Sequence, residues 1–136
     1  MPMDVMQMIY SALSNDKKLL QLLGGKDEKY RRIYNNPVSP YEDEFPRITM
    51  FEVMRQDVEW ADDRPQAVQV TARIDIWTKK NTLYKITKQV RSILLSCFLR
   101  CEVSPGSDMI EDYEKETRIY HKPIDVEIIL RRRENT

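Results

Sequence analysis

Two cysteines and one histidine are the side chains in this sequence best suited to metal or nucleophilic chemistry. Cys97 and Cys101 are the only cysteines, and His121 is the only histidine. A zinc site needs several ligands at suitable spacing, and a cysteine nucleophile needs a base within hydrogen-bond reach. His121 is the single candidate base, and the YHKP sequence around it is typical of a strand end. We therefore expect no metal site and no cysteine catalysis, and we expect both thiols to be free and partly buried.

Carboxylates and glycines offer no clearer site. The adjacent acids Asp62 and Asp63 lie in a polar stretch, as do Glu111 and Asp112, and carboxylates in such stretches are normally solvated. The chain has neither a G-x-G-x-x-G motif nor a P-loop, and three arginines near its end normally serve solubility. We expect no catalytic residue and no cofactor.

Length and composition predict one domain, covering residues 1–136. The chain is 41% hydrophobic and 32% charged, and its 22 basic and 22 acidic residues give no net charge. This balance argues against a general nucleic-acid binder, and no apolar run approaches the roughly 20 residues that span a bilayer. Residues 1–13 lack the basic start of a signal peptide. We expect a protein made and kept in a cytoplasm, with no membrane partner and no sequence-specific nucleic-acid partner.

The stretch from Gln66 to Lys79 is the strongest structural signal in the chain. One side of it, as an extended strand, carries Val68, Val70, Ala72, Ile74 and Ile76. The other side carries Gln69, Thr71, Arg73, Asp75 and Trp77. Unbroken alternation of this kind predicts a strand with one buried face. Burying its branched aliphatic side chains, at roughly 1.5–3 kcal/mol each, makes it the expected centre of the core.

Helical periodicity and capping residues predict the elements around this strand. The N-cap candidates are Asp4 and Asn15 for one broken helix or two short ones, and Asn81 or Thr82 for a longer helix that runs to Cys97. Further strands are predicted over Arg47–Arg55, Thr117–Tyr120 and Ile124–Leu130, with Pro123 either bending the last one or confining it to an edge. The order α-α-β-β-α-β predicts an α+β fold with two layers, a mostly antiparallel sheet with helices packed on one face.

Three segments between these elements are expected to be mobile loops. Residues 35–46 contain three prolines among acids, and residues 102–116 contain Pro-Gly-Ser among acids. Residues 56–65 contain four acids and Trp60, and their number argues against a tight turn. We therefore expect a hairpin with a long exposed tip there, and a frayed C-terminus after the last strand.

Several apolar side chains are left over on the sheet face away from the helices, or on the hairpin tip. They are Phe51, Val53, Trp60, Trp77 and Ile129. Such a group on one face suggests a covered surface. The cover is either a partner subunit or a third layer formed by the chain's own loops, and Trp60 either docks on a partner or folds back on its own sheet. The candidate assembly interface is Phe51, Val53, Trp60, Asp62, Asp63 and Trp77.

The order and spacing of several stretches resemble a known family. They are IYSALSNDKKLLQLLGG, then RIY, FPRITMFEV, ARIDIWTKK and TLYKITKQVRSILL, followed by the late strand. This layout resembles the small tail-completion, or head-to-tail joining, proteins of long-tailed phages and prophages. The proline-rich loop at 35–46 and the long segment at 102–116 depart from that pattern.

The resemblance implies a fold like that of the lambda-type tail terminators and a structural, non-enzymatic role. The expected protein assembles as a ring at the end of the tail, hexameric in the particle, which stops tail polymerisation and presents a surface to the head connector. Its expected partners are further copies of itself, the tail tube protein and the head connector or stopper protein. The protein is expected in the host cytoplasm during assembly and in the tail or neck of the finished virion. Two alternatives stay open: another phage neck or connector adaptor protein, and a small ligand-binding or enzymatic α+β domain.

Overall fold

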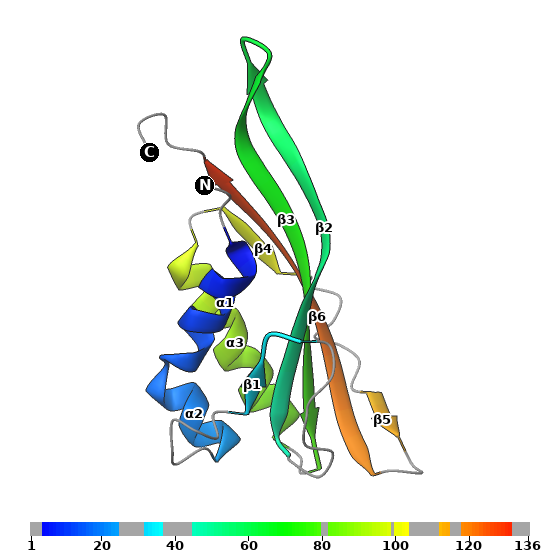
Figure 1. Cartoon of the computed structure of the whole chain (residues 1–136). Helices are drawn as coiled ribbons and strands as arrows, with labels where there is room; N and C mark the ends of the chain where they lie inside the picture. Colours follow the sequence, from blue (N-terminus) through cyan, green and yellow to red (C-terminus); the bar gives the residue numbers. More distant parts are fainter. Residues whose placement is uncertain are drawn as a thin grey trace.

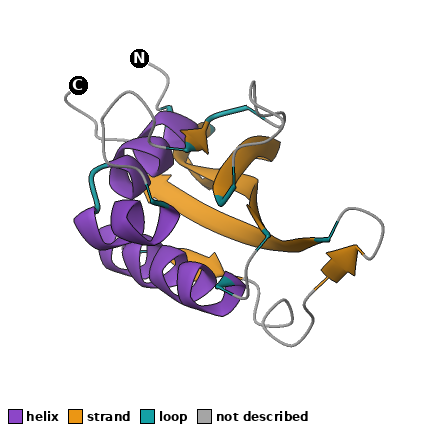
Figure 2. Ribbon diagram, turned by 90° about the horizontal axis from the view of Figure 1, so that it is seen from below, coloured by secondary structure: helices purple, strands orange, loops and turns teal. Residues whose placement is uncertain are grey.

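Three helices pack on one face of a six-stranded sheet, and no described element covers the other face (Figure 1, Figure 2). The computed structural model describes residues 4–24, 32–36, 45–79, 82–98, 100–103, 112–114 and 118–131. The helices are α1 (Val5–Ser14), α2 (Lys17–Leu23) and α3 (Leu83–Cys97). The strands are β1 (Ile33–Tyr34), β2 (Arg47–Ala61), β3 (Arg64–Thr78), β4 (Cys101–Val103), β5 (Asp112–Glu114) and β6 (Ile119–Arg131). This is the α+β architecture that the sequence predicts.

The two short helices begin at aspartates and end in ways that the sequence explains. The Asp4 carboxylate accepts a hydrogen bond from the Gln7 amide at 3.0 Å, and Asp16 accepts one from the Leu19 amide at 2.8 Å. The sequence predicts Asn15 as the second N-cap, but Asn15 ends α1 and Asp16 caps α2. Gly24 stops α2 with a left-handed φ of 76°. No helix in the described part of the chain is long and apolar enough to cross a membrane.

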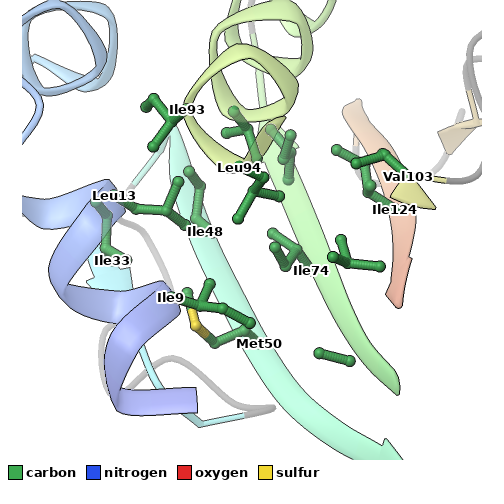
Figure 3. Close-up of a cluster of buried hydrophobic side chains, with 14 of the residues drawn as sticks. Ile9, Leu13, Ile33, Ile48, Met50, Ile74, Ile93, Leu94, Val103 and Ile124 are labelled. Carbon is green, nitrogen blue, oxygen red and sulfur yellow. The ribbon is translucent and has the colours of Figure 1, made fainter. Parts of the chain in front are cut away.

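Strand β3 is at the centre of the sheet, as its alternation predicts. The strand order is β1-β2-β3-β6-β4, with β5 also pairing β6, and every pairing except β1 with β2 is antiparallel. Ile74 lies between Met50 of β2 and Ile124 of β6, and all three side chains are fully buried. Figure 3 shows these side chains between the sheet and the helices, where Ile9 of α1 and Leu94 of α3 cover them.

Strand β6 is more continuous than predicted. It is continuous from Ile119 to Arg131 and pairs with β3 along one side, so the two strands predicted here form one strand, which runs along an edge only locally, around Pro123. On its other side β5 pairs with the start of β6 and β4 with residues 126–128. Pro123 falls in the gap between these partners. A residue without an N–H is tolerated there because no described strand occupies the outer side.

The segment 102–116 is also more regular than predicted. Strand β4 begins at Cys101 and β5 covers residues 112–114, so parts of this segment belong to the sheet. Strands of three residues are too short for their periodicity to be recognised. Three predicted segments lie partly outside the described residues. They are the remainder of segment 102–116, residues 37–44 of the proline-rich loop, and residues 132–136 of the frayed C-terminus.

Candidate functional site: the long hairpin and the open sheet face

Strands β2 and β3 form one long hairpin that extends beyond the helices (Figure 1). The two strands are paired from Arg47 opposite Trp77 to Ala61 opposite Arg64. Asp62 and Asp63 alone form the turn, with φ values of 52° and 61°. Positive φ at both central residues is the conformation that suits the twist of a tight hairpin, and aspartate tolerates it. The loop predicted at residues 56–65 is therefore wrong, although its exposed position is confirmed.

A bulge at Val53 explains why the sequence predicts the hairpin but not the continuation of β2 to Ala61. The register shifts by one residue between Glu52 and Met54, so the alternation of β2 changes phase there. Beyond the bulge, Arg55 and Asp57 lie opposite Val70 and Val68, on the side where apolar residues would continue an ordinary core strand. The period-two pattern is therefore broken halfway along a strand of 15 residues.

The exposed apolar side chains of this hairpin are concentrated on β2. Trp60 near the tip is 62% exposed, and Val53 and Met54 are also exposed, while Asp62 and Asp63 form the exposed turn. Trp60 lies opposite Pro65 of β3. The tip therefore combines a large uncovered indole with two carboxylates, and their role as an interface stays a prediction.

Phe51 and Trp77, the other predicted interface residues, are only partly exposed. The indole of Trp77 stacks on the ring of His121, with centroids 3.7 Å apart and parallel planes. Its Nε1 donates a hydrogen bond to the Thr49 hydroxyl at 3.1 Å. Trp77 is thus held by its own sheet, at the opposite end of the hairpin from Trp60.

An aspartate–histidine pair beside Trp77 is the closest approach to a catalytic arrangement among the described residues. His121 Nε2 lies 2.8 Å from the Asp75 carboxylate, which is buried beneath the open face. The cysteines lie elsewhere, on α3 and directly after it in β4, and both are free thiols. Burial raises the pKa of Cys101 to about 11, with Glu102 adding to the effect, so this thiol is not activated as a nucleophile. The described residues contain no group of metal ligands.

Polar pairs occupy the middle of the open face. The Arg73 guanidinium forms two hydrogen bonds with the Asp125 carboxylate, at 2.8 and 3.3 Å. Next to this pair, the Gln69 amide donates a hydrogen bond to Glu127. Ile129, also predicted for this face, lies opposite Gln69 and is partly exposed. The predicted apolar surface is therefore interrupted by polar pairs between the hairpin tip and Trp77.

Glu59 connects the outer part of the hairpin to the rest of the sheet through ion pairs. Its carboxylate forms ion pairs with Arg100, just before β4, and with Arg131, at the end of β6. The hydrogen bond from Arg100 holds the pKa of Glu59 below its ordinary value, and the positive charges of both arginines act in the same direction. Glu59 itself has a φ of 58°, which distorts β2 at this position.

Comparison with known proteins identifies the family. A family model described as tail completion protein gp17 matches residues 7–131, nearly the whole chain. The chain belongs to this family of phage tail completion proteins. No curated protein matches it. The resemblance inferred from the sequence is thereby confirmed, and membership makes the protein a structural component of the phage tail, of a non-enzymatic kind.

The helical layer of this tail completion protein differs in charge from the hairpin. Helices α1, α2 and α3 contain five basic residues and no acidic ones. Four of the five are exposed lysines, namely Lys17, Lys18, Lys85 and Lys88. Hairpin residues 52–66 instead contain five acids and two arginines.

A groove of about 440 Å³ lies between α1 and α3 on this basic layer. Small or polar side chains line most of it, including Ser11, Asn15, Gln89, Ser92 and Ser96, together with the carboxylate of Asp16. Neither the groove nor the basic face was predicted from the sequence. The sequence does contain the signal for the basic face, because the lysines fall on the outer positions of the predicted helices.

Proposed function

We propose that this tail completion protein is a tail terminator, or head-to-tail joining subunit, which assembles as a ring at the end of the tail tube. In this proposal the ring stops tube polymerisation and docks on the head connector or stopper protein. Assembly takes place in the host cytoplasm, and the ring contains six copies.

The observation that carries the proposal is the projecting hairpin, in a chain that belongs to the tail completion family. A ring subunit needs a rigid scaffold and a projecting surface that a neighbour can cover. The sheet and its buried core supply the scaffold, and the exposed Trp60 at the hairpin tip supplies apolar surface that the described part of the chain leaves uncovered. A net charge of zero means that no overall repulsion opposes close association of identical copies.

Electron microscopy of particles made without the protein tests the proposal. Over-long or headless tails would support a terminator, because the tube would have no stop and no joining surface. Tails of normal length with a defect confined to the neck would support the alternative of another neck or connector adaptor. Normal, infectious particles would contradict both.

A further inference from the structure

We infer that neighbouring copies in the ring join head to tail, with the β2–β3 hairpin of one subunit docking in the α1–α3 groove of the next. Trp60 enters the groove, and the acidic turn lies against the basic helical layer. This inference rests on the proposed ring and specifies the contact that builds it.

Charge complementarity is the first argument for this pairing. Three of the five hairpin acids are engaged within their own chain: Glu52 pairs with Arg55, Glu59 pairs with Arg100 and Arg131, and Asp57 also has a partner. Asp62 and Asp63 remain at the tip, where they meet solvent in the single subunit. The helices themselves contain only positive charge, including the exposed Lys85 and Lys88 of α3. The one carboxylate in the groove, that of the N-cap Asp16, accepts hydrogen bonds from Gln89 and from the Leu19 amide. Opposite potentials on two surfaces of one chain favour contact between copies and orient it.

The chemistry of the groove suits a tryptophan. Ala12 and Ile93 line the groove, and the exposed Met8 lies one turn before Ala12 on α1, so apolar contact for an indole is available. The serine hydroxyls of Ser11, Ser92 and Ser96 can accept the indole N–H. Small side chains also let a partner backbone approach closely. Buried tryptophans with a satisfied N–H are frequent anchors of protein interfaces.

Docking by side chains is favoured over addition of a strand to the edge of β2. Beyond Met50 this edge pairs with no described strand, so it is the obvious alternative surface. The bulge at Val53 and the positive φ of Glu59 both interrupt the regular row of backbone donors and acceptors. Such interruptions are a known protection of edge strands against pairing with another chain.

The geometry of the contact also predicts how it propagates. The hairpin and the groove are different surfaces of one chain, so each subunit can donate a hairpin to one neighbour and accept a hairpin from another. A contact of this heterologous kind forms closed rings when the rotation between copies closes.

Cross-linking between two forms of the subunit in assembled particles tests the inference. The first form carries Ala61→Cys beside Trp60 together with Cys97→Ser, so its accessible thiol is on the hairpin. The second form is the wild type, whose exposed Cys97 lines the groove. Cys101 reacts slowly in both forms because its pKa is raised to about 11. We expect a short bismaleimide to link one copy of each form when both are co-expressed, and to link neither form to itself when it is expressed alone.

Other outcomes overturn the inference. Particles that contain both forms but give no mixed pair would show that the hairpin and the groove do not meet. Links between two hairpin thiols would assign the hairpin a different partner. The same conclusion would follow if the hairpin thiol of the first form were linked to another virion protein and not to the second form. In all these cases the proposed ring function would stand. Particles that contain neither form would instead contradict the proposed function and the inference together.

Discussion

At the scale of single residues, the two tryptophans of the hairpin have opposite surroundings. Trp77 is half-buried, stacks on His121 and donates a hydrogen bond to Thr49. Trp60 is 62% exposed near the turn. An indole that contacts little of its own chain contributes little to folding, so its presence at an exposed tip is better explained by a partner that covers it.

Substitution of the two tryptophans should therefore separate folding from assembly. We expect Trp60→Ala to leave the melting temperature nearly unchanged and to block incorporation into phage particles. Trp77→Ala, the matched control, should lower the free energy of unfolding by roughly 1–3 kcal/mol, because it removes a partly buried ring and a hydrogen bond. Thermal melting and the subunit content of purified particles measure the two effects. A large loss of stability in Trp60→Ala, with normal incorporation of the folded fraction, would show that Trp60 packs on its own sheet.

At the scale of elements, the position of the outer hairpin depends on charges brought from three places in the sequence. Glu59 of β2 binds Arg100 before β4 and Arg131 at the end of β6. The pKa of Glu59 is lower in the folded protein than its ordinary value. The ionised carboxylate therefore stabilises the folded hairpin fully when the pH is above the ordinary pKa of glutamate. The stabilisation is lost as the pH falls through the lowered value, because a neutral Glu59 no longer pairs with the arginines.

Hydrogen exchange can measure this dependence directly. We expect the protection of hairpin amides 55–66, relative to those of the β3 core, to fall when the pH is lowered from neutrality to about 3 at low salt. Glu59→Gln should show weak protection already at neutral pH and a smaller change on acidification. The other acids of the hairpin are the same in both proteins, so the difference between them isolates Glu59. Equal pH dependence in the two proteins would contradict the role of this ion pair.

The elements also show what the sequence can predict and why it misses the rest. The alternation of β3 and the apolar stripe of α3 are long and uninterrupted, so both elements are predicted correctly. The outer half of β2 is missed because the bulge at Val53 changes the phase of its alternation, and because an Asp-Asp turn lacks the glycine of common hairpin turns. The contact of His121 with Asp75 and Trp77 depends on the register between β3 and β6, which no local pattern specifies.

At the scale of the whole molecule, opposite charges are separated between two surfaces of a chain with no net charge. The helices are basic and the hairpin is acidic. A head-to-tail contact uses both surfaces of every subunit, so a subunit with one defective surface still joins a growing ring through the other. It then prevents closure, which makes a one-sided defect dominant over the wild type.

Reversal of charge on α3 tests this dominance. We expect Lys85→Glu combined with Lys88→Glu to lower the yield of infectious particles when it is co-expressed with the wild type. A ring of six drawn from an equal mixture would be wholly wild type in only about one case in sixty, so the loss should be large. Adding Trp60→Ala to the same chain should relieve the effect, because that subunit can no longer donate its hairpin. Lys85→Arg with Lys88→Arg, which keeps the charge, should assemble normally. A defect that remains equally dominant after Trp60→Ala is added would show that the altered subunit enters the ring through some surface other than its hairpin.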